Sequence, residues 1–281
     1  MKKLSTDWHI HTEDSCDSAC LRMADLVAEQ KQNGITDYGV TDHLHTLLQE
    51  DDIWRSRAAY DAQMALHPEL QGHFHFGVEA SVMSQWQVDK MARGEFPVPP
   101  VYVYRDGAPA DAKMHIAVDA EFREKYGIEF VVTGVHWPLY EMYGKEVVAK
   151  EYFRQYLFAA AHPQTDILAH FLWWNSFVRD AETNPFLDFS IVSEQMRGEL
   201  KAALLENHTA FELNIGAILL APFPKTFLDE YMGWCGDLQR SGVVLSVGSD
   251  THAAHTSLAD YEKTDALLEH YGIDHEKLWC L

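Results

Sequence analysis

Seven short apolar segments recur along the chain, and a stretch with helical spacing of apolar residues follows each of them. The segments end at positions 11, 43, 79, 136, 170, 214 and 250, so successive ends are 32, 36, 57, 34, 44 and 36 residues apart. A strand that is joined to the next parallel strand through a helix takes about 30 residues or more. The spacing therefore predicts seven strand–helix units, with one interval too long for a single unit.

Strands that alternate with helices form parallel sheets, and right-handed connections keep the helices outside the sheet. We therefore predict an α/β fold whose strands close, or nearly close, into a seven-unit barrel. An open dinucleotide-binding sheet fits less well, because no Gly-x-Gly-x-x-Gly pattern follows the first strand. A single barrel domain is expected over residues 1–281.

The first helix is expected to begin near Met23 and to end at Gly34. Further helices are expected near residues 54–66, 111–126, 148–161, 193–207, 225–240 and 258–271. The long interval is interpreted as an insertion at about residues 82–111, which contains several prolines and a possible hairpin strand at residues 101–104.

The composition narrows the classes of function. A formal net charge of −21 argues against binding to a nucleic-acid backbone, which requires a basic surface. The four cysteines form no Cys-x-x-Cys pair or disulfide framework, which is typical of a reducing cytosol. The first residues lack the apolar core of a signal peptide, and no apolar run is long enough to cross a membrane. We therefore expect a cytoplasmic protein with no membrane partner.

Each predicted strand end carries a side chain that can bind a metal ion. In α/β barrels, the carboxyl ends of the strands converge on one face, where the chemistry takes place. Two histidines that lie two residues apart on a strand also point to the same side. The set comprises His9 and His11, His43, Glu79, His136, His170, Glu212 and Asn214, and Asp250 and His252. Imidazole together with carboxylate is typical of zinc, manganese or iron sites.

Six of these histidines, with Glu79, Asp250 and the nearby Asp17, make nine donors. One metal ion cannot use nine ligands, so the sequence predicts a cluster of two or three divalent ions. Eight other histidines lie in predicted helices or turns and are interpreted as structural or surface residues. His45 and His255 lie near the donors in the sequence, but nothing in the sequence positions their side chains.

Taken together, these motifs resemble the polymerase and histidinol phosphatase (PHP) family. The resemblance covers nearly the whole chain, and the motifs occur in the family's order. It rests on Asp7-Trp8-His9-Ile10-His11-Thr12, Ser15 through Asp17, Gly39-Val40-Thr41-Asp42-His43, Gly77-Val78-Glu79, Gly134-Val135-His136, Ala169-His170, Glu212-Leu213-Asn214 and Gly248-Ser249-Asp250-Thr251-His252.

The resemblance implies a distorted (β/α)7 TIM-like barrel with a trinuclear metal centre. It also implies a ligand set for each ion. The first ion would be held by His9, His11, Glu79 and Asp250. The second would be held by Glu79, His136 and His170, with Glu79 bridging the two ions, and the third by Asp17, His43 and His252.

Such a centre would attract a small phosphate in spite of the acidic chain. Three divalent ions would bring about six positive charges against the three carboxylates of Glu79, Asp250 and Asp17. The resemblance then implies a metal-dependent phosphatase, in which a metal-bound hydroxide attacks a phosphomonoester in line. Asp250 or His252 would handle the proton. A substrate like histidinol phosphate would place the enzyme in histidine biosynthesis.

Basic and aromatic residues are the candidates for contacts with the substrate. Arg22, Arg55, Lys145 and Arg179 are candidate phosphate ligands. Family phosphatases place a basic residue soon after the position of His170, whereas here Arg179 follows only after a longer, mostly apolar run. Trp137, Trp173 and Trp174 directly follow predicted ligands and could form an aromatic wall for an organic leaving group.

Three other functions remain open at this stage. Hydrolysis of phosphodiesters or oligonucleotides also occurs in the family, but the acidic charge argues against it. Metal-dependent amide hydrolysis uses the same kind of site. A non-catalytic metal-binding scaffold is the third, although the apparently complete ligand set disfavours it. The sequence leaves the metal, the physiological substrate and the oligomeric state open.

Overall fold

The computed structural model describes residues 3–17, 19–98, 107–140, 144–174, 184–252 and 256–281. In this part of the chain, parallel strands follow one another in the order β1, β2, β4, β7, β8, β9 and β10. Their bounds are β1 (Thr6–Asp7), β2 (Asp37–Val40), β4 (Phe74–Ser81), β7 (Phe130–Gly134), β8 (Ile167–Leu168), β9 (Ala210–Asn214) and β10 (Leu245–Gly248). A short strand, β3 (His43–Leu44), pairs with β4.

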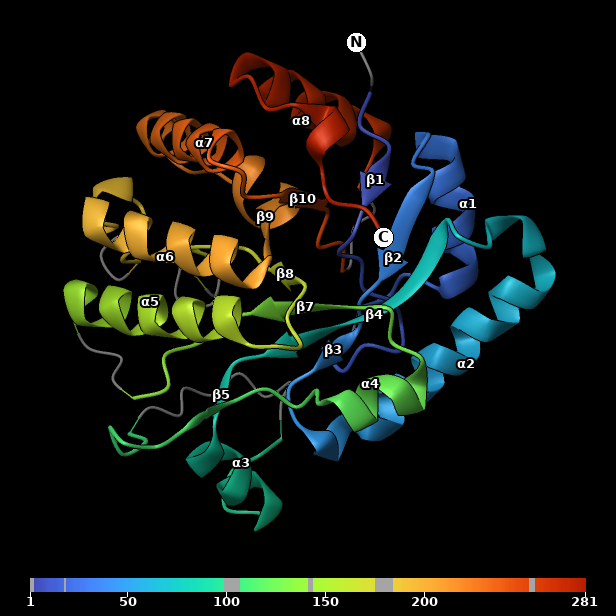
Figure 1. Cartoon of the computed structure of the whole chain (residues 1–281). Helices are drawn as coiled ribbons and strands as arrows, with labels where there is room; N and C mark the ends of the chain where they lie inside the picture. The colour runs from blue at the N-terminus through green and yellow to red at the C-terminus, as the bar shows by residue number, and fades with distance from the viewer. Residues whose placement is uncertain (1–2, 18, 99–106, 141–143, 175–183, 253–255) are drawn as a thin grey trace.

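Backbone hydrogen bonds join the first and last strands of this order. The Trp8 N–H donates to the carbonyl of Val247 at 2.9 Å, and the Asp250 N–H donates to the carbonyl of His9 at 2.7 Å. Figure 1 shows β1 beside β10, with the strands arranged around a common axis. The predicted seven-unit α/β barrel is therefore confirmed.

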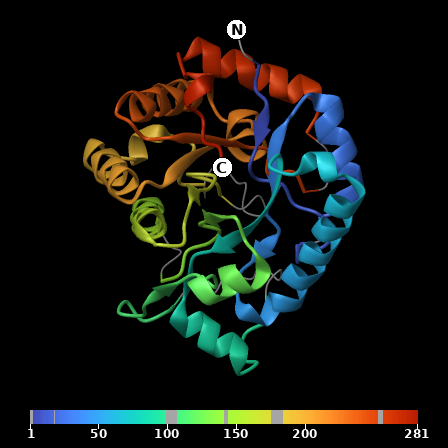
Figure 2. The same cartoon turned by 45° about the vertical axis from the view of Figure 1, so that its right-hand side comes forward.

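Helices surround the barrel on its outside (Figure 1, Figure 2). Six of them lie close to their predicted positions: α1 (Met23–Asn33), α2 (Glu50–Leu66), α5 (Lys145–Ala161), α6 (Glu194–Asn207), α7 (Lys225–Arg240) and α8 (Leu258–His270). Gly34 ends α1 as predicted, in the left-handed conformation with φ of 75°. Short helical turns occupy Leu47–Gln49, Pro68–Leu70, Phe189–Ile191 and His275–Lys277.

The helix predicted for residues 111–126 is wrong in its first half. The helix found there, α4 (Ala120–Tyr126), begins only after Asp119, whose Oδ1 accepts the N–H of Phe122 at 2.8 Å. The preceding segment contains β6 (Met114–His115), which pairs antiparallel with β5 (Met83–Ser84). A contact with a distant segment therefore overrides the local helical pattern.

The first part of the predicted insertion also contains a helix, α3 (Gln85–Ala92). Ser84 begins it with a capping box, in which the Ser84 hydroxyl accepts the N–H of Gln87 at 3.1 Å. The possible hairpin strand at residues 101–104 lies outside the described residues. Within the described ranges, no helix is long and apolar enough to cross a membrane.

Aromatic side chains fill the amino-terminal half of the barrel. The ring of Phe130 is so close to β2 and β4 that a Cβ atom at Gly39 or Gly77 would come within 2.4 or 2.6 Å of it. The ring of Trp8 packs edge-on against Phe130 and Trp279, with centroids 5.5 and 4.8 Å away. Apolar packing thus closes this half of the barrel, and polar side chains gather at the carboxyl-terminal ends of the strands.

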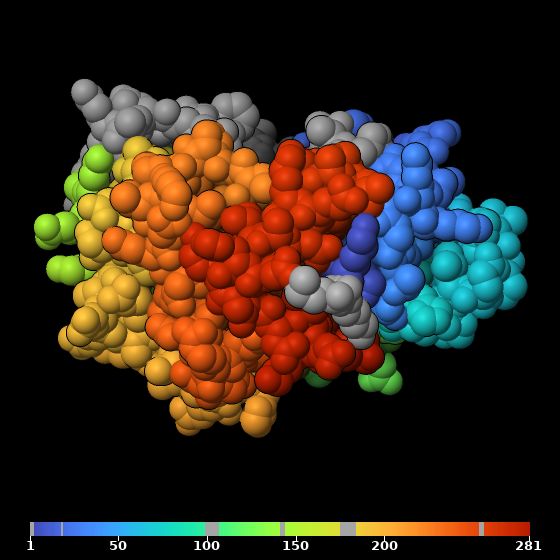
Figure 3. Space-filling view, turned by 90° about the horizontal axis from the view of Figure 1, so that it is seen from above, coloured from blue at the N-terminus to red at the C-terminus, as the bar shows by residue number. Residues whose placement is uncertain are grey.

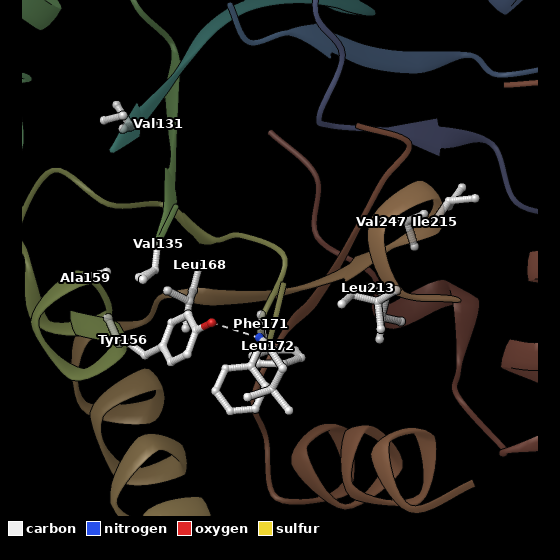
Figure 4. Close-up of a cluster of buried hydrophobic side chains, with 14 of the residues drawn as sticks. Val131, Val135, Tyr156, Ala159, Leu168, Phe171, Leu172, Leu213, Ile215 and Val247 are labelled. Atoms are coloured by element: carbon white, nitrogen blue, oxygen red, sulfur yellow. Dashed lines mark hydrogen bonds between the residues drawn. The ribbon is translucent and has the colours of Figure 1, made fainter. Parts of the chain in front are cut away.

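A second apolar layer lies between the sheet and its helices. Figure 4 shows part of it, where Tyr156 of α5 packs near Leu168, Phe171 and Leu172. The Leu172 N–H donates to the Tyr156 hydroxyl at 2.9 Å, which ties the turn after β8 to α5. Figure 3 shows the carboxyl-terminal part of the chain, in red, packed against amino-terminal segments, in blue.

Candidate metal centre

His9 and His11 follow β1 and direct their rings to the same side. Their Nε2 atoms lie 3.1 Å apart, and both side chains are fully buried. Asp7 holds the backbone here, because its Oδ1 accepts the N–H groups of His9 at 3.3 Å and Ser249 at 2.8 Å. The expectation that both rings reach one point in space is confirmed.

Glu79, near the end of β4, is the centre of the donor cluster. Its Oε2 lies 3.2 Å from Nε2 of His9 and 3.4 Å from Nε2 of His11. The same oxygen lies 2.9 Å from Nδ1 of His43, which begins β3 beside it. Three histidines from two neighbouring chain segments therefore face one oxygen of a fully buried carboxylate.

The second oxygen of Glu79 faces the next two strands. Its Oε1 lies 3.2 Å from Nε2 of His136 after β7 and 2.8 Å from Nε2 of His170 after β8. Both rings are buried. Glu79 therefore contacts histidines on both of its oxygens, which is the position of a bridging carboxylate.

Asp17, Asp250 and His252 complete the cluster on another side. Oδ2 of Asp17 lies 2.7 Å from Nε2 of His252 and 3.4 Å from Nε2 of His43. Oδ1 of Asp250 lies 3.3 Å from Nε2 of His11 and 3.4 Å from Nδ1 of His252. The structure thus brings all nine predicted donors into one continuous cluster.

Among the described residues, three groups of side chains could each hold an ion, because the donor atoms within each group lie within 4.8 Å of one another. They are His9, His11 and Asp250, then His43, Glu79 and His136, and then His11, His43 and His252. The first group lies within the first ligand set that the family resemblance implies. The other two differ from the implied sets, because His43 also faces Glu79 and because His11 also faces His43.

Several buried nitrogen and oxygen atoms of the cluster are of the kinds that bind metal ions and have no hydrogen-bond partner within the described structure. Nδ1 of His43 and Oε2 of Glu79 lie 2.9 Å apart, yet within the described structure neither atom has a hydrogen-bond partner. Oδ1 of Asp17 is also buried without one. Buried polar atoms are almost always paired, and an ion that binds them is one explanation for the exceptions. The residues present therefore fit a metal cluster.

The charges of the cluster compensate one another. Burial alone would raise the pKa of Glu79, but His43 and His9 hold it well below 4.5. Burial alone would lower the pKa of His9, but Glu212 and Glu79 raise it well above 6.5. Burial lowers the pKa of His136 to about 4. His136 is therefore neutral at pH 7, which is the form of histidine that binds a metal ion.

Glu212 contacts two of the predicted ligands, His9 and His170, and so orients them. Its Oε1 lies 2.7 Å from Nδ1 of His9, and its Oε2 accepts the backbone N–H of His170 at 2.6 Å. Nδ2 of Asn214 donates to Oε2 of Glu212 at 3.0 Å and to Oδ2 of Asp250 at 3.2 Å. The sequence signal was present, since Glu212 lies in β9 and Asn214 ends it, but it did not show which ligands they contact.

Two glycines leave room for the side chains of the cluster to pack together. A Cβ atom on Gly134 would lie 2.4 Å from Oε1 of Glu79 and 2.6 Å from Cε1 of His136. A Cβ atom on Gly248 would lie 2.3 Å from Oε1 of Glu212 and 2.4 Å from Cβ of His9. These positions are glycine because side chains from neighbouring strands occupy the space.

Ser81 is a contact of the cluster that sequence reasoning missed. Its hydroxyl lies 2.7 Å from Nδ1 of His136 and 2.5 Å from Nδ1 of His45. The ring of His45 also stacks on that of His43, with centroids 4.8 Å apart. His45, which the sequence did not position, is therefore a buried neighbour of two predicted ligands.

Two predicted ligands have an unusual backbone conformation. Asp250 has φ of 55° and His170 has φ of 24°, in the region that side-chain-bearing residues rarely adopt. The Asp250 N–H bonds to His9, and the Leu172–Tyr156 bond holds the turn after His170. Such strain often lies at functional sites, where the surrounding structure compensates for it.

The predicted substrate contacts have different surroundings. Trp137 is buried, with its ring 5.7 Å from that of His136. Lys145 begins α5 on the surface, and the exposed Arg22 forms a two-pronged ion pair with Asp25 at 2.6 and 2.8 Å. Nothing in the contacts of Arg22 supports a phosphate role, which stays a prediction. Arg179 lies outside the described residues.

Comparisons with known proteins identify the family and support the fold. The PHP domain model matches residues 7–214. The fold is similar to that of a histidinol phosphate phosphatase from Lactococcus lactis subsp. lactis Il1403, solved as a complex with zinc, L-histidinol and phosphate. The two chains share 17% sequence identity and a TM-score of 0.61, over 96% of this chain and 94% of the other. No curated protein sequence matches the chain.

Proposed function

The chain belongs to the PHP domain family of metal-dependent phosphoesterases, and from this premise we propose that it hydrolyses a small phosphomonoester at a cluster of two or three divalent metal ions. The central observation is the buried Glu79 carboxylate, which contacts three histidines through Oε2 and two through Oε1. Hydrogen bonding alone does not account for this arrangement, because Oε2 has no hydrogen-bond partner in the described structure.

The donor set suits zinc, manganese or iron(II). In the proposal, one ion would be held by His9, His11, Glu79 and Asp250, and a second by Glu79, His136 and His170. A third would be held by Asp17, His43 and His252. When bound, such ions lower the pKa of water and neutralise the oxygens of a phosphate.

The charge of the loaded cluster favours an anionic substrate. Three divalent ions carry about six positive charges, and the carboxylates of Glu79, Asp250 and Asp17 carry about three negative ones. The chain as a whole has a net charge of −21, so a long polyanion such as an oligonucleotide is repelled outside the cluster. A small phosphomonoester fits better than a phosphodiester in a nucleic acid.

Asp250 and His252 are proposed to handle the proton. The side chain of His252 is 33% exposed and that of Asp250 is 11% exposed, whereas the contacting side chains of Glu79 and His11 are fully buried. These two side chains are therefore more accessible to water than those of Glu79 and His11. Nδ1 of His252 lies 2.9 Å from the backbone carbonyl of Asp250 and 3.4 Å from its Oδ1, so the ring of His252 is held beside this carboxylate.

The experiment is to load the purified protein with zinc, manganese or iron(II) and to count bound ions by elemental analysis. Phosphate release is then measured from a panel that includes histidinol phosphate, other monoesters and phosphodiesters. The expected result is two or three ions per chain with monoester turnover. Turnover of diesters alone would contradict the proposal. Bound metal without any phosphate release would also contradict it and would favour an amidohydrolase or a scaffold.

Glu79→Gln tests the role of the bridging position with a side chain of nearly the same size. We expect loss of at least one ion and at least a thousandfold loss of kcat, because the remaining ligands lack the shared negative charge. His67→Ala is the control, since His67 lies at the end of α2 and its side chain is 41% exposed. Unchanged metal content in Glu79→Gln would contradict the assignment.

A further inference from the structure

A second pair of polar side chains lies next to two of the predicted ligands where β3 and β4 meet. The two strands pair in parallel, with His43 opposite Glu79. Residues two apart on a strand point to the same face. His45 and Ser81 follow the two ligands at this spacing, and both of their side chains are fully buried. The pairing of the strands therefore brings His45 and Ser81 together beside the cluster.

The Ser81 hydroxyl lies between two imidazole nitrogens. Its Oγ is 2.7 Å from Nδ1 of His136 and 2.5 Å from Nδ1 of His45. In the described part of the chain, these are the hydrogen-bond contacts of this hydroxyl. Nε2 of His136, on the other side of its ring, lies 3.2 Å from Oε1 of Glu79. A line of contacts therefore runs from Glu79 through His136 and Ser81 to His45.

The protons along this line follow from the chemistry of each group. A neutral imidazole carries one proton, so one of its nitrogens donates and the other accepts. If Nε2 of His136 binds an ion, the proton of this ring is on Nδ1 and is donated to Ser81. The hydroxyl proton is then left for Nδ1 of His45, which accepts it if His45 carries its own proton on Nε2. A proton on Nδ1 of His45 would instead leave a buried hydroxyl without an acceptor, which costs free energy.

The surroundings of His45 hold its ring in place. The His45 N–H donates to Oε1 of Gln49 at 3.1 Å. The ring stacks on that of His43, with centroids 4.8 Å apart, and its centroid lies 5.5 Å from that of Trp137. A ring that is enclosed in this way offers Nδ1 in one direction, so it can keep the Ser81 hydroxyl in one orientation.

We propose that Ser81 and His45 are positioning residues that fix the tautomer of His136 through a directed chain of hydrogen bonds. In this chain, Nδ1–H of His136 donates to Ser81, and the Ser81 hydroxyl donates to Nδ1 of His45. The chain offers Nε2 of His136 to an ion and holds the plane of its ring. The inference rests on the proposed function, because it takes His136 as a metal ligand, but it does not depend on the substrate.

The positions of the protons can be read from the zinc-loaded protein labelled with ¹⁵N-histidine. A two-bond ¹H–¹⁵N correlation spectrum shows which nitrogen of each imidazole carries a proton, and the signals of His45 are those that disappear in His45→Phe. We expect His45 to carry its proton on Nε2 and none on Nδ1. A proton on Nδ1 of His45 would overturn the inference.

This readout separates the inference from the proposed function. A zinc-loaded protein that shows the expected spectrum but hydrolyses no phosphomonoester would overturn the proposed function and leave the hydrogen-bond chain standing. A protein that binds none of zinc, manganese and iron(II) would overturn both.

Removal of the hydroxyl tests its contribution to metal binding. Ser81→Ala leaves Nδ1–H of His136 without its acceptor, so we expect about tenfold to hundredfold weaker zinc binding in competition with a chelator. Ser246→Ala is the matched control, because Ser246 is also a buried serine in a strand, but its hydroxyl has no hydrogen-bond partner within the described structure. Wild-type affinity in Ser81→Ala, or an equal loss in Ser246→Ala, would overturn the inference.

A double-mutant cycle distinguishes a chain of hydrogen bonds from two independent contacts. His45→Phe keeps an aromatic ring and removes the acceptor, so it should weaken zinc binding, though less than Ser81→Ala does. His45→Asn, whose amide oxygen can accept from Ser81, should recover part of this loss. In the double variant Ser81→Ala/His45→Phe, the affinity should equal that of Ser81→Ala, because the chain is already broken at the serine. Losses that multiply in the double variant would show that His45 acts independently of Ser81 and would overturn the inference.

Discussion

Oε1 of Glu212 lies 2.7 Å from Nδ1 of His9, while Nε2 of the same ring faces Glu79. The carboxylate thus fixes which nitrogen of His9 carries a proton and which is offered to a metal ion. A histidine ligand is commonly oriented in this way by a carboxylate on its other nitrogen. Glu212 is therefore a positioning residue, and its contribution is measurable apart from that of the ligands.

Glu212→Gln is expected to weaken metal binding about tenfold to hundredfold. The amide has about the same size, but its NH₂ group would face either Nδ1–H of His9 or the two donors of His170 and Asn214. Competition with a chelator measures the affinity. Glu230→Gln on the exposed surface of α7 is the control. If both variants retain wild-type affinity, Glu212 does not orient His9.

Gly134→Ala and Gly198→Ala are expected to have opposite effects on stability. A Cβ atom on Gly134 would lie 2.4 Å from Oε1 of Glu79, so the variant should lose about 1–3 kcal/mol of unfolding free energy and bind metal more weakly. Gly198 lies inside α6 with no atom within 4 Å of an added Cβ, and its replacement should stabilise by about 0.5–1 kcal/mol. Urea unfolding measures both. A stable Gly134→Ala variant with wild-type metal affinity would show that the cluster can relax around the methyl group.

The donor cluster was predictable because its residues recur at the ends of apolar segments, and a barrel brings the ends of its strands together. Strands that run parallel bring their carboxyl ends together, so His43, Glu79, His136 and His170 could be grouped from their positions at the ends of apolar segments. The structure places them within a few ångströms of one another, as described above.

The remaining features depend on contacts that no local pattern reveals. Glu212 contacts His9 across 203 positions of the sequence, and Ser81 contacts His136 across 55. The strand predicted to end at Glu79 did not include Ser81, and the sequence did not show which donor Glu212 faces. The helix predicted from residue 111 failed for the same reason, because Met114 pairs with β5.

Trp279→Ala is expected to lower the unfolding free energy by about 1–3 kcal/mol without changing metal content. Its ring lies 4.8 Å from that of Trp8 and 5.6 Å from that of Phe130, at the amino-terminal end of the barrel. The metal centre lies at the other end. Trp54→Ala, at a position that is 62% exposed, is the matched control and should stay within about 0.5 kcal/mol. Equal effects of the two replacements would refute a packing role for Trp279.

Asp7 gives the metal-free protein a stability that depends on pH. Burial raises the pKa of Asp7 from 3.8 to about 6, although Tyr261 and Ser249 donate hydrogen bonds to its carboxylate. The folded protein therefore binds the proton more tightly than the unfolded chain does. As a result, the contribution of Asp7 to the unfolding free energy falls as pH rises from about 4 to 6, by up to about 3 kcal/mol.

Asp7→Asn removes this charge and keeps the shape. In the variant, Oδ1 can still accept the two backbone N–H groups, and Nδ2 can donate to the hydroxyl of Tyr261, which has Gln30 as a second acceptor 3.5 Å away. We expect the variant to be more stable than the wild type above pH 6, and this difference to shrink as pH falls toward 4. Urea unfolding of both metal-free proteins across that range measures it. A difference that does not change with pH would mean that Asp7 stays ionised in the folded protein down to its ordinary pKa.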